Sequence, residues 1–234
     1  MMQEYSTELI FRQPVSSDMV IFRFTKPQNW TFEVGQFISL KFGERSFRAY
    51  SIASLPEENF IELVVRLVAG GLASEVFRTA KIGQKFVFRG AFGQFQLSEN
   101  LAFPLVFCAT GSGIAPLRAM IRSEARKPNP RPMYLLYGGR TLSDLAYWEE
   151  FVKFSNLTIY LGLSQASETE VEVLAFQPEV QVHRGRITHF VRPEMFGNDA
   201  EYYICGNGDM VTRVREQLLA QFVKETHIHQ ERFN

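Results

Sequence analysis

Cysteine and histidine are both scarce in this sequence. The 234 residues include two cysteines, Cys108 and Cys205, and four histidines. Two cysteines are too few for a four-cysteine iron–sulfur cluster or a zinc ribbon, so any such centre would have to lie on a partner protein. The "HIH" at 227–229 has no nearby third ligand, which favours an exposed strand end over a metal pair. We therefore predict no metal site.

Net charge and long apolar runs are also lacking. The chain has 25 basic and 25 acidic residues, so no overall field favours nucleic acid or an anionic membrane surface. No window approaches the roughly 20 apolar residues of a membrane-spanning helix. The start, "MMQEYSTELIFRQP", lacks a basic segment followed by an apolar stretch. We expect a soluble, cytoplasmic protein that binds no nucleic acid.

Two common catalytic motifs are absent. The sequence contains no G-x-S-x-G elbow and no G-x-x-x-x-G-K-[ST] loop. Hydrolase and nucleotide-triphosphatase functions are therefore disfavoured.

What is present divides the chain in two. Residues 1–99 carry short apolar alternations broken by turns, such as "MVIFRFTKP", "QFISLKFGE" and "QKFVFRGAFG", which predict an antiparallel barrel with little helix. Residues 102–234 alternate buried runs ("FPLVFCAT", "MYLLYGGR", "LTIYLGLS", "EYYICGNG") with helical segments ("APLRAMIRSEAR", "SDLAYWEEFVKF", "MVTRVREQLLAQFVKE"). That alternation predicts an α/β doubly wound parallel sheet, with the domain boundary near 97–103.

A glycine-rich turn follows the first buried run. In "TGSGIAP", Gly111 and Gly113 permit a tight turn, and Pro116 lies where a helix begins, so free amides there would suit a pyrophosphate. The turn departs from the G-x-G-x-x-G fingerprint, because proline replaces the third glycine and no acid follows about 20 residues later. A purely structural turn is the alternative. Three further strand ends also carry small or polar residues, at 138–140, at Ser164 and at 205–210.

The stretch "RAYSIAS" at 48–54 lies in the barrel half. Arg48 offers a forked cation for a phosphate, Tyr50 a flat ring, and Ser51 a hydroxyl close to that ring. The "AGGLAS" at 69–74 adds a second amide-rich turn suited to phosphate. Judged by residue types alone, a strand-edge arginine and a core tyrosine remain the better interpretation.

The order of these motifs resembles the ferredoxin–NADP reductase family. R-x-Y-S, G-G-x-x-S, "RGAFG", G-x-G-x-x-P and C-G-N-G-x-M follow one another along nearly the whole chain. The resemblance implies an FAD-binding barrel followed by a nicotinamide-binding α/β domain, without a fused ferredoxin domain. A site for a diphosphate implies FAD rather than FMN.

The same resemblance implies roles for individual residues. Arg48 would pair with the flavin pyrophosphate, Tyr50 would stack on the isoalloxazine, and Ser51 would hydrogen-bond near the hydride-accepting nitrogen. Backbone amides in the second turn would cap the pyrophosphate. The implied FAD site comprises Arg48, Ala49, Tyr50, Ser51, Gly70, Gly71, Leu72 and Ser74.

A second set would hold NADPH or NADH beside the flavin. Cys205 would shape the pocket where nicotinamide meets flavin and is not expected to be a nucleophile, because the implied chemistry is hydride transfer between cofactors. The implied nicotinamide site comprises Thr110, Gly111, Gly113, Pro116, Gly139, Arg140, Arg186, Cys205, Gly206, Asn207 and Met210.

The end of the chain, "HQERFN", resembles the family's acid and aromatic pair. Glu231 would help to move protons, which makes it the third implied catalytic residue with Ser51 and Cys205, and Phe233 would cover the flavin. The aromatic is Phe rather than Tyr and Asn234 follows it, so a plain exposed tail is the alternative.

The nucleotide and the electron acceptor stay open. Arg140 and Arg186 resemble positions of NADP-dependent members, but Gln165 stands where those members carry arginine. The acceptor would be a small electron carrier such as ferredoxin, flavodoxin or an oxygenase component, docking on a basic rim for which the candidates are Arg12, Arg23, Lys41 and Arg45. The alternatives are a free-flavin reductase and a non-autonomous electron-transfer subunit of a larger complex.

Overall fold

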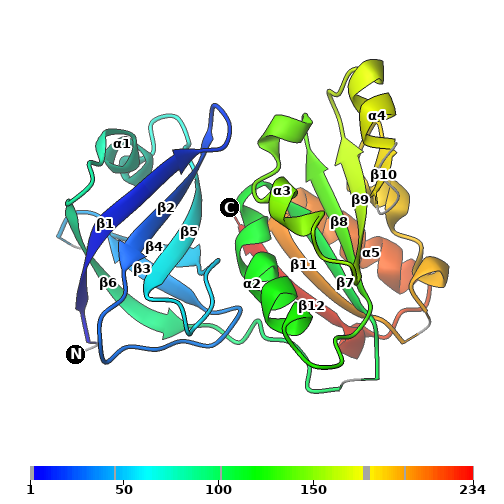
Figure 1. Cartoon of the computed structure of the whole chain (residues 1–234), viewed down its shortest axis with the longest axis horizontal. Coiled ribbons are helices and arrows are strands. Elements are labelled where there is room, and N and C mark those ends of the chain that lie inside the picture. Colours follow the sequence, from blue (N-terminus) through cyan, green and yellow to red (C-terminus); the bar gives the residue numbers. More distant parts are fainter. Residues whose placement is uncertain (1–2, 45, 101, 176–179, 198, 234) are drawn as a thin grey trace.

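The computed structural model describes residues 3–44, 46–100, 102–175, 180–197 and 199–233. It contains two six-stranded sheets, one in each half of the chain (Figure 1). The first is built from antiparallel pairs and the second from parallel pairs. The predicted fold class, an antiparallel barrel followed by a doubly wound α/β domain, is confirmed.

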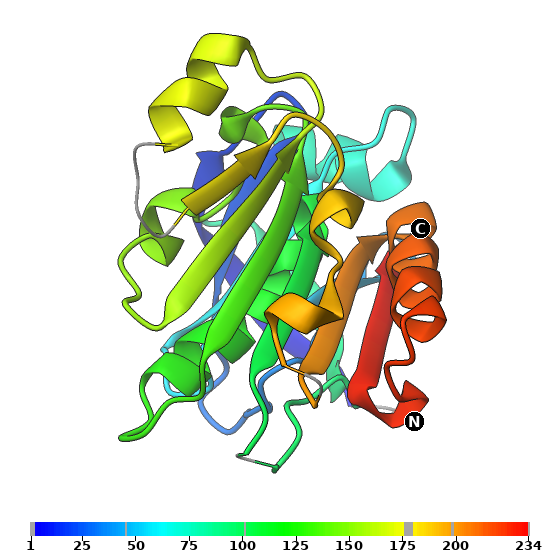
Figure 2. The same cartoon turned by 90° about the vertical axis from the view of Figure 1, so that its right-hand side faces the viewer.

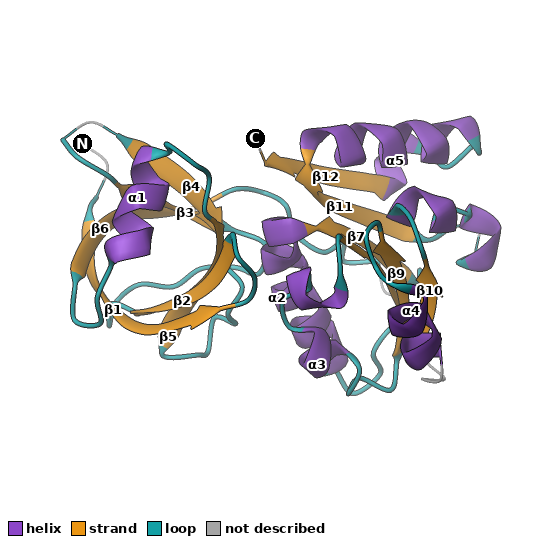
Figure 3. Ribbon diagram, turned by 90° about the horizontal axis from the view of Figure 1, so that it is seen from above, coloured by secondary structure: helices purple, strands orange, loops and turns teal. Residues whose placement is uncertain are grey.

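The antiparallel sheet has the order β4-β3-β6-β1-β2-β5 and closes into a barrel (Figure 3). A bridge between Ile52 and Leu63 joins the first and last strands of that order, and the Ala53 amide donates to the Glu62 carbonyl at 2.8 Å. Closure leaves no long open edge. The strands are β1 (Tyr5–Pro14), β2 (Met19–Thr25), β3 (Phe37–Lys41), β4 (Phe47–Ser51), β5 (Phe60–Arg66) and β6 (Lys85–Phe92).

Phenylalanine side chains fill the barrel and pack against helix α1 (Leu72–Thr79). Helix α1 inserts Phe77, which is fully buried, with its ring centroid 4.7 Å from that of Phe22 and 5.5 Å from that of Tyr50. This packing sets the position of α1 relative to β4. The two segments singled out in the barrel half, "RAYS" and "AGGLAS", are therefore held together by one aromatic core.

The parallel sheet has the order β10-β9-β8-β7-β11-β12. In Figure 3, helices α2 and α3 cover one face and α5 the other, and Figure 2 shows the strands running side by side. The strands are β7 (Leu105–Thr110), β8 (Met133–Gly139), β9 (Leu157–Leu163), β10 (Val180–His183), β11 (Glu201–Asn207) and β12 (Ile228–Phe233). The helices are α2 (Ile114–Ala125), α3 (Trp148–Phe151), α4 (Glu168–Ala175) and α5 (Gly208–Ala220), with short 3₁₀ turns η1 (Gly111–Gly113), η2 (Leu142–Asp144), η3 (Ile187–Phe190), η4 (Pro193–Met195) and η5 (Glu225–His227).

Two predicted helices are shorter than their apolar spacing indicates. The segment "SDLAYWEEFVKF" forms η2 and only one turn of α3, because Tyr147 between them has φ 63°, a left-handed conformation that interrupts a helix. Helix α5 ends at Ala220, since Phe222 has φ 62°. The two edge strands are β10, which the sequence did not predict, and β12, which begins within the "HIH" segment expected to be a strand end.

The two domains share one apolar core. Helix α2 lies between the parallel sheet and the barrel (Figure 1). Its Leu117, Met120 and Ile121 belong to the same buried cluster as Ile21 and Val64 of the barrel. A large hydrophobic contact of this kind opposes relative domain motion. In the part of the chain that the structure describes, no helix has the length and apolarity needed to cross a membrane.

Candidate active site between the two domains

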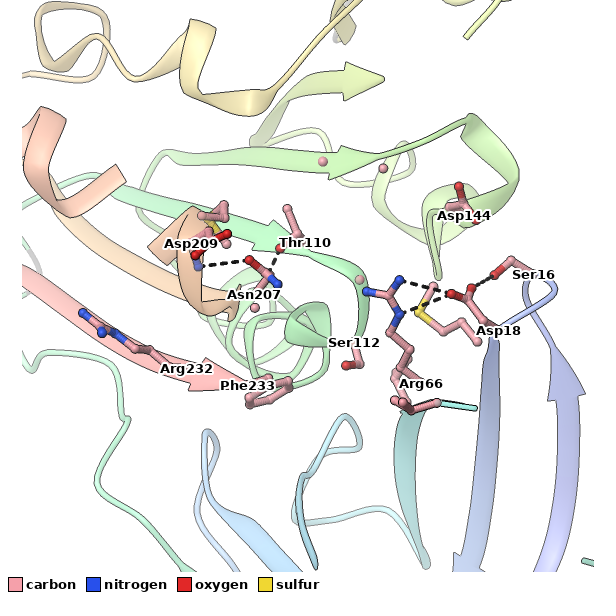
Figure 4. Close-up of a pocket in the computed structure, with 18 of the residues that line it drawn as sticks. Ser16, Asp18, Arg66, Thr110, Ser112, Asp144, Asn207, Asp209, Arg232 and Phe233 are labelled. Atoms are coloured by element: carbon pink, nitrogen blue, oxygen red, sulfur yellow. Dashed lines mark hydrogen bonds and ion pairs between the residues drawn. The ribbon is translucent and has the colours of Figure 1, made fainter. Parts of the chain in front are cut away.

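A cavity of about 1340 Å³ lies between the barrel and the carboxyl edge of the parallel sheet (Figure 4). Sites for single drug-sized ligands occupy about 300–1,000 Å³, so this cavity exceeds the needs of one such ligand. The predicted site residues that line it are Arg48, Ala49, Tyr50, Ser51, Gly71, Leu72, Ser74, Thr110, Gly111, Gly139, Arg140, Arg186, Gly206, Asn207, Met210, Glu231 and Phe233. Four others, Gly70, Gly113, Pro116 and Cys205, are not in its lining.

Strand β4 supplies the barrel side of the cavity. The Arg48 side chain is exposed, and its guanidinium donates to two neighbours in the sequence, to the Phe47 carbonyl at 2.8 Å and to Ser46 Oγ at 3.2 Å. Within the described residues it forms no ion pair. The Tyr50 ring packs edge-on against Phe77, and burial raises the pKa of its hydroxyl. This wall therefore offers an uncommitted forked cation beside a fixed aromatic ring.

The turn before α1 forms the neighbouring wall. Gly70 has φ 70°, which favours glycine, and Gly71 is the N-cap of α1. The buried Ser74 hydroxyl accepts a hydrogen bond from the Val68 amide at 2.8 Å, so this side chain closes the turn. The backbone amides at the start of α1 are what this segment offers to an anion.

The glycines of the second domain serve two structural purposes: one leaves the backbone open to the cavity, and two others permit close backbone packing. Gly111 has φ 55°, and a side chain there would meet open space, so its backbone faces the cavity unobstructed. A Cβ on Gly113 would lie 2.3 Å from the Cys205 carbonyl oxygen, and one on Gly206 would lie 2.5 Å from Thr110 Oγ1. Both values are far inside van der Waals contact. Gly113 and Gly206 therefore permit the turn after β7 to pack against β11.

Strand β12 brings the predicted acid into the site. Ser51 Oγ donates to Glu231 Oε2 at 3.0 Å, joining residues 180 positions apart in the sequence. Glu231 pairs in register with Cys205, which is completely buried. Burial raises the pKa of Glu231, although the bond from Ser51 opposes this, and burial with the nearby Glu231 raises the pKa of the Cys205 thiol. The exposed-tail alternative is therefore wrong, because residues 228–233 form the edge strand β12 and Glu231 is partly buried against the cavity.

The remaining polar groups of this edge come from β11 and α5. Asn207 caps α5, since its side-chain oxygen accepts from the Asp209 backbone amide at 3.0 Å. The backbone amide of Asn207 donates to Thr110 Oγ1 at 3.3 Å (Figure 4). Phe233 ends β12 opposite Asn207 and also lines the cavity. These bonds lock together the ends of β7, β11 and β12.

A charge cluster that the sequence did not indicate lies on the opposite side of the cavity. Arg140 contacts Asp144 at 2.7 Å and Asp18 of the barrel at 3.0 Å, while Arg66 contacts Asp18 at 3.2 Å (Figure 4 labels both acids and Arg66). The hydrogen bonds that Arg140 donates to Asp144, together with the negative charges of Asp144 and Asp18, raise the pKa of Arg140. Arg186 lines the cavity with no acidic partner among the described residues. Arg140 is thus a neutralised cation and Arg186 is not.

Several candidates for a carrier-docking rim are committed elsewhere. Arg23 forms an ion pair with buried Glu62, and its guanidinium lies 4.6 Å from the ring centroids of both Phe11 and Phe60. The prediction of Arg23 as a free surface cation is therefore wrong. Lys41 pairs with Glu4 at 3.4 Å, and Arg12 lies 6.0 Å from the Phe22 ring centroid. Arg45 lies outside the described residues.

The histidines near the end of the chain have structural partners. His229 stacks on the Tyr203 ring at 4.6 Å and contacts Glu201 at 2.6 Å, so it is less exposed than the sequence indicated. The His227 ring lies tilted against that of Phe103, with the ring centroids 5.3 Å apart. Within the described ranges, no group of three His, Cys, Asp or Glu side chains is arranged to hold a metal ion.

Comparison with known proteins matches each domain separately. Residues 6–97 match the model of the oxidoreductase FAD-binding domain, and residues 107–216 match that of the oxidoreductase NAD-binding domain. The chain is 29% identical to ferredoxin–NADP reductase B of Sorangium cellulosum, over 99% of this chain and 98% of that protein. It is 28% identical to the toluate 1,2-dioxygenase electron transfer component of Pseudomonas putida over 86% of this chain, but that match spans only 59% of the relative's length.

Solved structures show the same fold. A ferredoxin NADP⁺ reductase from Neisseria gonorrhoeae with bound FAD and NADP superposes with a TM-score of 0.81 at 20% identity, covering 98% of both chains. A cytochrome P450 reductase from Amycolatopsis gives a TM-score of 0.84 at 24% identity, covering 100% of this chain and 71% of that one. The family inferred from the motifs is confirmed. The chain belongs to the ferredoxin–NADP reductase family, as an oxidoreductase with an FAD-binding barrel and a nicotinamide-binding domain.

Proposed function

We propose that the protein takes electrons from NADPH or NADH onto FAD and passes them to a separate one-electron carrier: a ferredoxin, a flavodoxin or an oxygenase component. The observation that carries the proposal is the Ser51–Glu231 contact, because it places a barrel hydroxyl and a sheet-domain carboxyl at one point of a cavity shared by both domains. The relatives from Sorangium and Pseudomonas support it, one as a ferredoxin–NADP reductase and one as an oxygenase's electron transfer component.

The barrel wall suits FAD. Arg48, which has no ion-pair partner among the described residues, would take the pyrophosphate, with the Leu72 amide at the start of α1 beside it, whereas the Gly71 amide donates to the Val68 carbonyl at 3.3 Å. Tyr50 would provide the stacking surface, because Phe77 and Phe42 hold its ring. When bound, FAD supplies the redox chemistry, since it accepts an electron pair and releases electrons singly.

The sheet wall suits a nicotinamide dinucleotide. It lies at the switch point of the sheet order, at β7, which has β8 as its neighbour on one side and β11 on the other. The open backbone at Gly111 and the start of α2 would accept the pyrophosphate. Met210 and Gly206 would border the nicotinamide, and Phe233 would cover the flavin until the nicotinamide takes its place.

Ser51 and Glu231 would govern protons at the junction. Ser51 Oγ donates to Glu231 Oε2 at an oxygen–oxygen distance of 3.0 Å, and the raised pKa of Glu231 brings its titration closer to neutral pH. The Cys205 thiol stays protonated because its pKa is raised, so it shapes the site without acting as a nucleophile. A serine backed by a carboxyl of raised pKa is suited to donate a proton and recover it from solvent.

Absorbance spectroscopy of the purified protein tests this function. We expect a flavin spectrum that bleaches anaerobically on addition of NADPH or NADH, and a bleached protein that then reduces ferricyanide. The nucleotide that bleaches faster is the donor. A protein that binds no FAD but reduces free flavin with either nucleotide would instead establish the free-flavin reductase. A protein that does neither would favour the dependent subunit.

Replacing Arg140 is expected to weaken the binding of NADPH and of NADH equally. The Arg140→Ala variant would leave Asp18 and Asp144 facing the cavity, which would raise KM for NADPH and NADH alike, by about fivefold, or roughly 1 kcal/mol. The double variant Arg140→Ala, Asp144→Asn should recover part of the loss. If KM rose for NADPH alone, Arg140 would instead be a ligand of its additional phosphate, as the family resemblance suggests.

A further inference from the structure

Helix α2 faces the barrel with arginines spaced one turn apart. The spacing of four residues places them on one side of the helix. Each pairs with a carboxylate of β5 or of the loop before it: Arg118 with Glu62, Arg122 with Glu58, and Arg126 with Glu57. The series runs from buried to exposed, since the side chain of Arg118 is 7% exposed and that of Arg126 is 52% exposed.

Arg118 donates hydrogen bonds from two of its three nitrogens. Besides its bond to Glu62, Nη1 donates to the Ala53 carbonyl at 2.9 Å, and Nε donates to Glu150 of α3 at 2.7 Å. Its guanidinium lies 3.9 Å from the centroid of the Tyr147 ring, and the Tyr147 hydroxyl donates to Glu62 at 3.0 Å. A planar guanidinium shared among three acceptors fixes both distance and angle between them.

The partners of Arg118 connect the two walls of the cavity. Ala53 stands two residues after Ser51 on the barrel side, and Arg118 stands one helical turn after Ile114, where α2 begins behind the glycine turn. One buried guanidinium therefore joins the Ser51 segment to the Gly111–Gly113 turn. Hydrophobic packing alone would hold α2 against the barrel, but it is tolerant of small slides.

We propose that Arg118 is a positioning residue that sets the separation between the Ser51 segment and the Gly111–Gly113 turn. The inference rests on the proposed function, because the two segments are the walls that would carry the flavin and the nicotinamide nucleotide. Transfer between two bound cofactors depends steeply on their separation, and a displacement of about 1 Å can cost about 100-fold in rate. Arg118 thus acts without touching either cofactor.

The test compares Arg118→Lys and Arg118→Leu with a control, Arg126→Gln. Arg126 forms the exposed ion pair with Glu57 at the C-terminal end of the same helix. The Lys variant keeps the charge and loses the fork, so it should fold and retain FAD. We expect anaerobic bleaching of its FAD by saturating nucleotide to slow about tenfold, with KM nearly unchanged. Hydrogen exchange at the amides of 52–54 and 112–115 should speed up about tenfold. Arg126→Gln should match the parent in both measurements.

Two outcomes would overturn the inference. Parent-like bleaching in the Lys variant would make Arg118 a purely structural residue, even if exchange increased. Parent-like exchange at both segments would show that the fork does not hold them. If the parent protein itself is not bleached by either nucleotide, the proposed function fails, while the exchange comparison still decides whether Arg118 couples the two segments. Should the Leu variant not fold, the Lys variant alone decides the question.

Discussion

Replacing Gly113 with alanine is expected to lower the free energy of unfolding by about 3 kcal/mol and to weaken binding of NADPH and NADH. The new Cβ would lie 2.3 Å from the Cys205 carbonyl oxygen and 2.5 Å from the Gly206 Cα, and both of these are backbone atoms that no side-chain rotation can move away. Either α2 or β11 would have to shift. Overpacking of this kind costs about 1–3 kcal/mol, with the upper end expected where backbone must move.

Urea unfolding followed by tryptophan fluorescence would measure this loss. The matched control is Gly208→Ala, because a Cβ on Gly208 meets nothing within 4 Å and Gly208 lies in the first turn of α5. We expect its unfolding free energy to stay within about 0.5 kcal/mol of the parent. Equal stability of the Gly113 and Gly208 variants would contradict the close packing of the glycine turn against β11.

The second large effect is expected at the Ser51–Glu231 contact. Ser51→Ala should slow anaerobic bleaching of the flavin about 100-fold, because positioned proton donors contribute about 10²–10⁴-fold. Glu231→Gln should slow it less, since an amide still accepts the Ser51 hydrogen bond. Rapid-mixing absorbance measurements with FAD-saturated variants would give both rates. Bleaching at the parent rate in the Ser51 variant would remove Ser51 from the proposed catalytic set.

The pH dependence of stability gives an independent test of Glu231. Its pKa is raised by burial, so the folded protein binds more protons than the unfolded chain over the interval between the two pKa values. The parent should therefore lose stability as the pH rises through that interval, whereas Glu231→Gln should not. Unfolding free energies of both proteins at about pH 4 and about pH 8 would show this: the difference should shift in favour of the variant at the higher pH. A difference independent of pH would mean that the carboxyl is effectively solvated.

The sequence predicted those features that depend on local patterns. Alternating apolar residues predicted the barrel, and buried runs followed by small residues predicted β7, β8, β9 and β11. The order of the motifs predicted the family, and the resemblance to that family placed Ser51, Glu231 and Phe233 at one flavin site. The ends of α3 and α5 could not be predicted, because Tyr147 and Phe222 adopt left-handed conformations that bulky aromatic residues seldom take.

Features that depend on tertiary contact were beyond reach. Asp18 lies in an ordinary turn between two strands, and nothing near it in the sequence indicates that it meets Arg140 across the domain boundary. Arg118 sits in "LRAMIRSEAR", where evenly spaced arginines are typical of a solvated helix face. Only the packing of α2 against the barrel makes that face an interior one. Nor does the sequence indicate the role of the Glu62 carboxyl, because it is a single acid within the apolar run of β5.

The position of β12 has a consequence for synthesis on the ribosome. The strands of the barrel lie within the first 92 residues, so the barrel can fold while the rest of the chain is still being made, whereas the glycine turn at 111–113 packs against β11 and forms only with it. Glu231 is added more than 100 residues later, and β12 must then insert beside an existing β11. The contact between Ser51 and Glu231 therefore forms only after β12 has been made and has paired with β11, long after the barrel strands have left the ribosome.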